Sequence, residues 1–335
     1  MRRHVRRAVL SLAFSLLAAF ALSGPANGAS PARLLAKYQP VTVFDPLESF
    51  LPTSVESFVE DTDLELLTGP NTWTLVNPAP QADALPGPGT GIWRLNHDGC
   101  TPAAGLAAVA CYVAAGGDGE NVVYGRVVRI GDRIVLQYWY FYDDNFYSYA
   151  YPASDFIWQA HEGDWEVVNV VLAEEEEEGE VELEARFVGY SQHCLGERRR
   201  WSKTPRWRGS HPIVHVAIGS HANYFSPGTH PIHTSCLPPQ AIALLQQAGL
   251  PLPVDYAASG SAAGPARFGG EVTSVVQVQE QSPSWLLFPG FWGELEFLHA
   301  PPPIGTVPIG LSPVGPAYHA VWQAPLATLA GWPRG

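Results

Sequence analysis

The chain has 335 residues, including 32 glycines and 31 prolines, and a formal net charge of −13 at pH 7. This charge argues against a nucleic-acid partner, because general nucleic-acid binders carry a positive balance that neutralises phosphates. The length is sufficient to bury a large core, and no internal repeat of fixed period is present.

The first 29 residues have the layout of a secretory signal peptide. Four arginines precede an apolar run over residues 8–22, and small residues follow it. The run is shorter than the roughly 20 residues that a membrane span needs, and no later segment qualifies as a transmembrane segment. We therefore expect cleavage between Ala26 and Ala29 and a secreted or periplasmic protein. Loss of the four arginines would change the formal charge from −13 to −17. This negative charge would attract cations, or it would serve only to keep the protein soluble.

The segment after this leader mixes short extended and helical signals. Residues 38–59 hold an extended piece and then a short helix, which is expected to open near Pro52 to Ser54, where a hydroxyl can cap it. The proline-rich stretch 77–90 predicts an irregular surface loop.

Strand signals dominate from residue 121 onward. Short runs rich in Val, Ile, Tyr and Trp occur within residues 121–130, 133–142, 164–172, 181–191 and 211–225. One convincing helix is predicted near 238–249, bounded by Pro at its start and by Gly and Pro at its end. We therefore predict a mainly β fold: a single β-sandwich of largely antiparallel sheets over residues 30–335, with one or two peripheral helices.

Four cysteines are present: Cys100, Cys111, Cys194 and Cys236. An even number behind a signal peptide favours disulfides over metal thiolates, and the chain has no C-x-x-C pair. Their order suggests that Cys100 pairs with Cys111 and Cys194 with Cys236, although the sequence permits three connectivities.

The stretch HEGDWEVVNVVL places His161, Asp164 and Glu166 at the start of an apolar strand. Residues two apart on a strand share a face, so Asp164 and Glu166 project together and His161 can fold back toward them. Such groups repel and desolvate one another unless something positive lies between them. A divalent cation is the simplest partner. The alternative is that the carboxylates pair with Arg or Lys or with loop backbone.

The preceding strand offers a fourth oxygen ligand, because YWYFYDDN ends in Asp143, Asp144 and Asn145. If the two strands are neighbours in one sheet, their acidic ends meet at the same edge. Oxygen-rich ligation with a single histidine suits Ca²⁺, Mg²⁺ or Mn²⁺ better than a structural zinc. We therefore expect a divalent cation held by Asp144, His161, Asp164 and Glu166.

Several segments in a fixed order resemble one known family. They are PLESFLPTSVESFV, YWYFYDDN, HEGDWEVVNVVL, YSQH, HPIVHVAIGSHANYF, FWGELEF and GPAYHAVWQAP. Together they resemble the vacuolar protein sorting-associated protein 62 family over most of the mature chain. That family's name describes a phenotype, so the resemblance implies no mechanism.

The core H-x-x-D-W-E is also similar to the central motif of the necrosis- and ethylene-inducing-like proteins. This resemblance implies a secreted β-sandwich that holds a divalent cation and binds sphingolipid sugar head groups. It places the metal ligands on His161, Asp164 and Glu166, with an upstream ligand at Asp144 or, as second choice, Asp143. The chain departs from the toxin pattern at residues 160, 162 and 163, where Ala, Glu and Gly replace Gly, Arg and His. Its loop from Asp144 to His161 is also longer. These departures argue against toxin activity and leave the ligand set intact.

Other residues are candidates for binding a ligand at this rim. His193 and His221 each lie near the end of a predicted strand, although most single histidines are structural or surface groups. Residues 194–209 gather six basic side chains around two tryptophans, and Arg200 and Trp201 could stack on a sugar or hold a phosphate. The alternative for this segment is a solvated loop partly neutralised by the glutamates of residues 174–178.

The leading hypothesis is an exported β-sandwich protein whose divalent cation recognises a polar small molecule, a glycan or a lipid head group. Binding is favoured over catalysis, because no G-x-S-x-G, phosphate-binding Gly-rich loop or H-E-x-x-H motif is present. One alternative is a metal-dependent hydrolase of phosphate esters or glycosides, with water activated by the cation. Another is a structural envelope protein in which the acidic cluster is paired internally.

Overall fold

The computed structural model describes residues 30–97, 99–115, 121–149, 157–177, 180–258, 267–268 and 275–335. The expected signal peptide, residues 1–29, lies outside the described residues. Within these ranges, no helix has both the length and the apolar character needed to cross a membrane.

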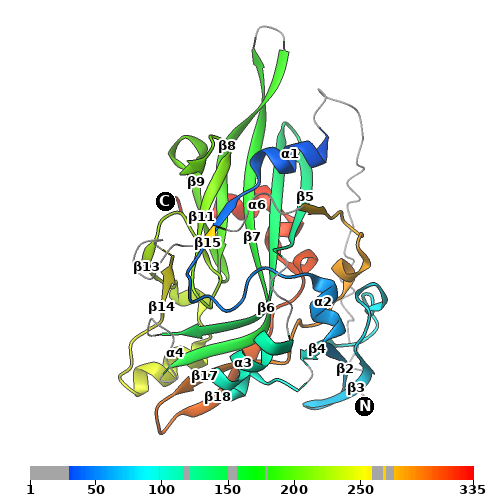
Figure 1. The fold of residues 1–335 in the computed structure, drawn as a ribbon, viewed down its shortest axis with the longest axis vertical. Coiled ribbons are helices and arrows are strands. Elements are labelled where there is room, and N and C mark those ends of the chain that lie inside the picture. Colours follow the sequence, from blue (N-terminus) through cyan, green and yellow to red (C-terminus); the bar gives the residue numbers. More distant parts are fainter. Residues whose placement is uncertain are drawn as a thin grey trace, which may run out of the picture.

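An eight-stranded sheet forms the centre of the fold, with β6 and β7 as its long middle strands (Figure 1). Its strand order is β16-β5-β6-β7-β17-β18, and β8 pairs with β7 and then with β9. Among the described strands of this sheet, β16 and β5 pair in parallel and the other pairs are antiparallel. The strands are β5 (Val123–Ile130), β6 (Arg133–Ser148), β7 (Trp158–Glu177), β8 (Glu180–Gln192), β9 (Leu195–Arg200), β16 (Val275–Gln277), β17 (Leu295–Ala300) and β18 (Gly305–Leu311).

A second, five-stranded sheet covers one face of the large sheet. It consists of β1 (Val41–Phe44), β10 (Arg206–Trp207), β11 (His211–Val216), β12 (Asn223–Tyr224) and β15 (Arg267–Phe268). Between the two sheets, Tyr140 and Val168 of the large sheet belong to one buried cluster with Phe44, Val214 and Val216. The predicted β-sandwich is thus confirmed, and its apolar interior accounts for the Val- and Tyr-rich strand signals.

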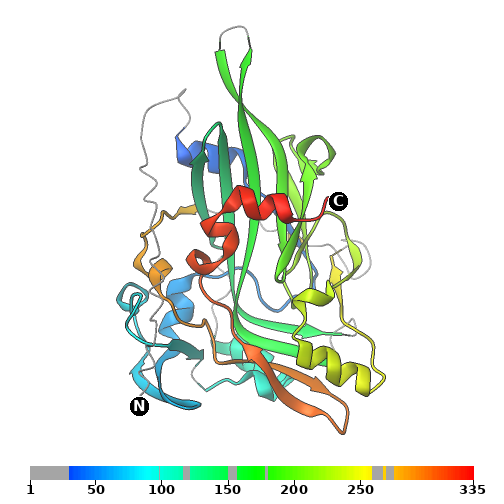
Figure 2. The ribbon, with the colours of Figure 1, turned by 180° about the vertical axis from the view of Figure 1, so that it is seen from behind.

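Aromatic side chains pack on the other face of the large sheet. Trp139 and Trp165 point there and share a core with Trp285, Trp292 and Trp322. The helices α5 (Ala320–Gln323) and α6 (Pro325–Gly331) cross this face (Figure 2). Because strand residues alternate, this arrangement sends Asp164 and Glu166 into the sandwich side, as the sequence predicts.

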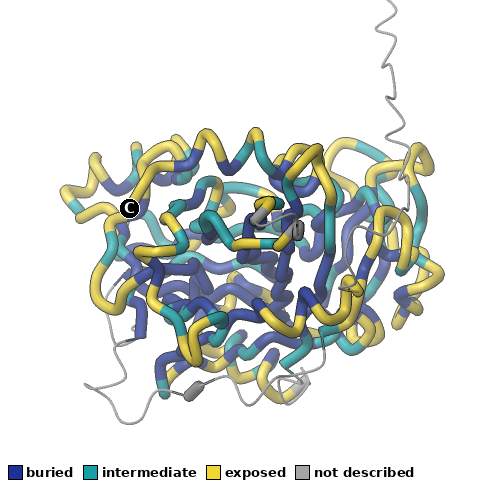
Figure 3. The backbone as a smooth tube through the Cα atoms, turned by 90° about the horizontal axis from the view of Figure 1, so that it is seen from above, coloured by how far each residue is buried: buried dark blue, intermediate teal, exposed yellow. Residues whose placement is uncertain are grey.

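The remaining elements are short and surround these layers. The helices are α1 (Pro31–Tyr38), α2 (Val55–Glu60), α3 (Leu106–Ala115) and α4 (Pro239–Gln247), with 3₁₀ turns η1 (Ala82–Ala84), η2 (Pro102–Ala104), η3 (Trp201–Lys203), η4 (Thr234–Cys236), η5 (Ser284–Leu287) and η6 (Pro316–Tyr318). The strands β2 (Thr62–Gly69), β3 (Thr72–Pro78) and β4 (Trp93–His97) form a small sheet, and β13 (Gly228–Pro231) pairs with β14 (Val254–Ala257). Buried backbone runs through the centre, and exposed turns lie outside (Figure 3).

Several predictions of local structure are confirmed. The helix expected near 238–249 is α4, and the helix expected near Pro52 to Ser54 is α2, where the Ser54 hydroxyl accepts from the Ser57 N–H at 3.2 Å. Both expected disulfides are present, Cys100–Cys111 and Cys194–Cys236. The expectation of one or two helices was too low, since the described residues contain six α-helices of at most ten residues. Helices this short depend on tertiary packing more than on sequence propensity.

One stretch of β7 has a strand partner on only one side. β17 pairs with β7 as far as Ala160, and β8 begins to pair at Val168. No strand of the described structure pairs with residues 161–167 on that side; we call this stretch the fork. Instead, the Val167 N–H donates to the Ser191 hydroxyl at 2.7 Å. Gly163 adopts a φ of +57° with the Trp292 carbonyl directly against it. At the fork, the polar side chains of β7 therefore have no neighbouring strand on this side.

The close approach at Gly163 gives a stability test. A Cβ at Gly163 would lie 2.1 Å from the Trp292 carbonyl oxygen, so Gly163→Ala requires a backbone shift. We expect it to lower the free energy of unfolding by more than about 2 kcal/mol in urea titrations, because steric clash adds to left-handed strain. Gly131→Ala is the matched control, with a φ of +62° and open space around its Cβ. Equal losses in the two variants would show that the Trp292 contact does not constrain the fork.

Candidate functional site

Five buried ionisable residues gather on the sandwich side of the fork, and we call them the fork cluster. Asp144 comes from β6, and Asp164 and Glu166 come from β7. Glu48 lies in the loop after β1, and His221 lies in the turn before β12. All five have less than a tenth of their surface exposed. The cluster therefore brings together two predicted carboxylates of β7, one of β6, and a histidine from far along the chain.

His221 supplies the positive charge beside Asp164. Its Nδ1 donates to Asp164 Oδ2 at 3.0 Å, its Nε2 lies 3.6 Å from Glu48 Oε1, and its ring stacks on Tyr142 at 3.8 Å. Burial lowers the pKa of His221, but Glu48 and Asp164 outweigh it and raise that pKa to about 10. The two carboxylates thus favour the imidazolium form of His221 at neutral pH. The partner of Asp164 is a histidine, where the structural alternative expected Arg, Lys or loop backbone.

The turn that carries His221 is fixed by Glu48 and by its own backbone. The Gly219 N–H donates to Glu48 Oε2 at 2.7 Å, and the Phe50 N–H donates to Glu48 Oε1 at 2.9 Å. His221 has a φ of +53°, a strained value for a residue with a side chain. Functional sites often hold such strained residues, and here the strain directs the imidazole between two carboxylates.

Glu166 is held by neutral donors. The Ser191 hydroxyl donates to its Oε2, and the Asn223 amide lies 3.4 Å from the same oxygen. Burial, and then the charge of Asp164, raise the pKa of Glu166 well above its ordinary value. This carboxyl group therefore favours either a proton or an added cation.

Asp144 is the least satisfied member of the cluster. It is fully buried, and within the described structure neither of its carboxylate oxygens has a hydrogen-bond partner of normal geometry. Burial, and then the charge of Glu162 across the ladder, raise its pKa well above the ordinary value; the nearby Asn145 N–H offsets only part of this. A buried carboxylate without a partner is costly unless a proton or a cation neutralises it.

His161 is oriented by its own backbone. Its Nδ1 lies 2.9 Å from the Gly163 carbonyl oxygen and 3.2 Å from that of Glu162. Since a carbonyl only accepts, Nδ1 carries the proton and the lone pair of the neutral ring is on Nε2. A metal-binding histidine commonly shows this arrangement, with one ring nitrogen donating to a carbonyl. Strand alternation places Asp143 on the opposite face of β6 from Asp144, so Asp144 remains the first choice upstream.

The four predicted metal ligands lie on two neighbouring strands, yet they do not converge as they stand. Among the described residues, no group of three or more His, Cys, Asp or Glu side chains is placed to hold a metal ion. Asp164 is engaged by His221 and Glu166 by Ser191. The donor types suit a hard cation, and the donors would have to draw together around it. The metal site stays a prediction.

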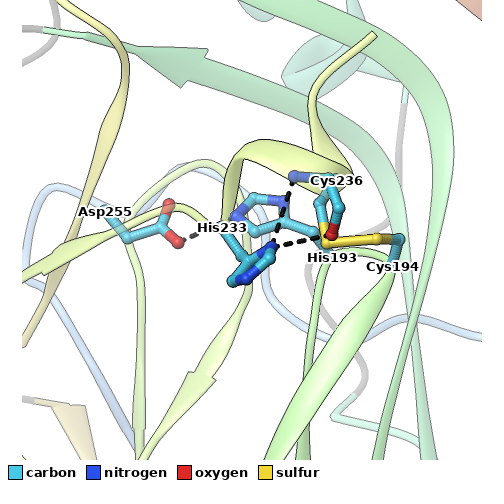
Figure 4. The surroundings of a disulfide bond; sticks show 6 residues. His193, Cys194, His233, Cys236 and Asp255 are labelled. Atoms are coloured by element: carbon cyan, nitrogen blue, oxygen red, sulfur yellow. Dashed lines mark hydrogen bonds and ion pairs between the residues drawn. A yellow bond between two sulfur atoms is a disulfide. The ribbon is translucent and has the colours of Figure 1, made fainter.

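His193 belongs to a neighbouring network beside the Cys194–Cys236 disulfide (Figure 4). Its Nε2 lies 2.8 Å from Asp255 Oδ2, and Asp255 also accepts from the Ser220 and Tyr224 hydroxyls at 2.6 and 2.5 Å. Burial lowers the pKa of His193, but Asp255 raises it to about 9. His193 thus supports the turn that carries His221, since Ser220 is part of that turn.

Arg200 and Trp201 are not brought to the fork. Arg200 is exposed and lies opposite Phe187 on β8, three residues from Tyr190, which marks the end of the fork. The glutamates at the start of the β7–β8 tip pair with Arg129 and Arg186. The suggested neutralisation of the basic segment by this tip was therefore wrong for those glutamates.

Sequence reasoning missed three buried acids near the site: Glu48, Glu162 and Asp255. Glu162 accepts from the Tyr112 hydroxyl at 2.8 Å and from the Glu294 N–H at 2.9 Å, and burial raises its pKa to about 8. Its position beside Asp164 was visible in the sequence, and its orientation was not. Glu48 and Asp255 carry no local signal, because long-range folding alone brings them to their histidines.

No protein-family model matches the sequence, and no curated protein matches it. The resemblance to the vacuolar protein sorting-associated protein 62 family therefore stays a prediction.

Similar solved structures include Necrosis and Ethylene inducing Protein 2 from the causal agent of cocoa's witches' broom disease, at 14% identity and a TM-score of 0.30 over 60% of this chain and 70% of that chain. The non-toxic HaNLP3 protein is 13% identical, with a TM-score of 0.33 over 78% and 80%. NLPPya in complex with glucosamine is 12% identical, with a TM-score of 0.33 over 74% of each chain. Likeness at these scores carries no argument about function.

The His193–Asp255 pair predicts a pH-dependent contribution to stability. Because the folded pKa of His193 is raised to about 9, its stabilisation is complete below the unfolded pKa of about 6.5 and is lost as the pH rises through 9. His193→Asn, which tolerates the φ of +55°, should cost about 2 kcal/mol at pH 6 and distinctly less at pH 10 in urea unfolding. His233→Asn, an exposed control in the same region, should show no such trend. A cost for His193→Asn that is independent of pH would contradict the ion pair.

Proposed function

We propose that this chain is an exported binding protein whose fork cluster holds one divalent cation. Through that cation it would recognise a polar ligand such as a glycan or a lipid head group. The observation that carries the proposal is Asp144, a fully buried carboxylate whose two oxygens have no hydrogen-bond partner of normal geometry within the described residues, with only the Asn145 N–H nearby. The two disulfides fit an oxidising, extracytoplasmic compartment.

The charges of the fork cluster support this proposal. Four carboxyl groups, those of Glu48, Asp144, Asp164 and Glu166, surround a single imidazolium, His221. The remaining negative charge must be removed by protons or by a cation. A divalent ion bound by Asp144, Asp164 and Glu166, with His161 presenting Nε2, would neutralise the cluster without protonation.

The ligand would bind at the exposed side of this cation. The Asp164 side chain is 11% exposed, so it is the member that connects the cluster to solvent. Oxygen-coordinated Ca²⁺ or Mn²⁺ retains positions that sugar hydroxyls or phosphate oxygens can occupy. This chemistry is common to a glycan and a lipid head group.

A purely structural cluster is the second candidate, favoured by the ion pairs of His221 with Asp164 and Glu48. The hydrolase alternative gains no support from His221, since both of its ring nitrogens face carboxylates and neither is free to act as a base. Chelator-sensitive turnover of chromogenic phosphate esters or glycosides would support the hydrolase alternative.

Asp144→Asn separates cation binding from a structural role. Because the Asp144 oxygens have no hydrogen bond of normal geometry to lose, and the Asn amide oxygen can still accept from the nearby Asn145 N–H, we expect the substitution to leave the melting temperature in chelator within about 2 °C of the native value. Saturating Ca²⁺, Mg²⁺ or Mn²⁺ should raise the native melting temperature by about 5 °C and leave the variant unchanged.

Asp132→Asn is the matched control, since Asp132 is exposed at the β5–β6 turn, and it should respond to cations as the native protein does. If the native protein gains no stability from any of the three cations, the structural reading holds and the proposal fails.

A further inference from the structure

Residues 200–208 carry four basic side chains that no acidic side chain of the described residues neutralises, and we call this segment the basic platform. They are Arg200, Lys203, Arg206 and Arg208, and none of them forms an ion pair with an acidic side chain within the described residues. Six arginines elsewhere are paired in this way: Arg94, Arg126, Arg129, Arg133, Arg186 and Arg199. Unpaired basic side chains are unexpected in this chain, because its acidic residues outnumber its basic ones by 32 to 19.

The platform is held in place by aromatic stacking. The Arg206 guanidinium lies 4.8 Å from the centre of the Trp201 ring and donates to the Trp201 carbonyl. The Arg208 guanidinium lies 4.0 Å from the centre of the Trp207 ring. Stacking of this kind fixes the guanidinium plane while its N–H groups stay free for other partners. An ordered set of donors loses less entropy on binding than a flexible one.

The backbone beneath the platform is also ordered. The Thr204 hydroxyl donates to the Arg200 carbonyl at 2.9 Å, and the Ile213 N–H donates to the Pro205 carbonyl at 3.0 Å. Trp201 packs edge-on against Tyr38 of α1. The Lys37 ammonium lies 5.0 Å from the centre of the Tyr38 ring and adds a fifth cation near the platform. The segment is therefore an ordered, solvent-exposed surface that includes β10 of the second sheet.

The platform presents aromatic as well as cationic groups to solvent. Trp207 is 37% exposed with the exposed Arg208 stacked on it, and Arg200 and Lys203 are also exposed. The platform joins β9 to β11, and Arg200 at its start pairs with Phe187, three residues along β8 from Tyr190 at the end of the fork. The ion pairs of the fork cluster involve His221 and no basic side chain of the platform.

We propose that the basic platform binds an anionic polysaccharide, one that carries carboxylate or sulfate groups on its sugar rings. Guanidinium groups match carboxylate and sulfate oxygens in a two-pronged geometry, and an exposed indole provides an apolar surface for the C–H face of a sugar ring. Duplex nucleic acid fits less well, because its bases are stacked inside the helix and leave no flat apolar face for the exposed indole of Trp207. This inference does not depend on the cation site.

The test measures binding of the native protein to polygalacturonate and to heparin by isothermal titration, in chelator and at low salt. The double variant Lys203→Gln, Arg208→Gln should bind about tenfold more weakly or worse, since two charged donors are lost. Arg129→Gln, Arg133→Gln is the matched control, because it removes the same charge from exposed positions of the β5–β6 hairpin. The control should bind within about twofold of the native protein.

Trp207→Ala tests the aromatic contribution at constant charge and should weaken binding about fivefold or more, whereas Trp73→Ala, another arginine-stacked tryptophan, should have no effect. Four outcomes would overturn the proposal: no binding to either polysaccharide, equal losses in the variant and control pairs, equal affinity for duplex DNA, or binding only to phosphatidylserine vesicles. Binding that persists in Asp164→Asn and in chelator would keep this inference intact even if the cation proposal failed.

Discussion

The interruption of strand pairing along β7 is the constraint on which the site depends. Between Ala160, the last residue paired with β17, and Val168, the first paired with β8, the strand must satisfy its backbone in other ways. Ser191 bonds the Val167 backbone, and the Trp292 backbone packs against Gly163. Asp164 and Glu166 point from this stretch into the sandwich and are buried there, although no strand pairs with β7 beside them on this side. Their charge must therefore be balanced locally.

The protein balances part of this charge through long-range contacts. Glu48 fixes the turn that presents His221, and His221 pairs with Asp164. A second pair, His193 with Asp255, supports the same turn through Ser220. These contacts leave Asp144 and Glu166 with raised pKa values, and Asp144 has no hydrogen-bond partner of normal geometry within the described residues. Buried groups of this kind are where a ligand, a proton or a cation has the largest effect on stability.

The sequence predicted the parts of the fold that depend on local pattern. Strand alternation placed Asp164 and Glu166 on one face and Trp165 on the other, and caps and prolines located α2 and α4. Local pattern could not predict that β8 and β17 share one edge of β7, because strand order follows from long-range packing. For the same reason it missed Glu48 and Asp255, and it did not foresee that His221 would take the position of a cation beside Asp164. The basic segment was visible in the sequence, but its stacked and unpaired arrangement was not.

The metal content of the mature protein, purified without chelator or affinity tag and measured by elemental mass spectrometry beside Asp144→Asn, tests the fork cluster most directly. A cation bound by the fork cluster predicts about one equivalent of Ca, Mg or Mn in the native protein and none in the variant. Native protein that contains no metal, and that remains metal-free after dialysis against all three cations, would contradict it. The buried carboxyl groups of the fork would then be neutralised by protons and by His221 alone.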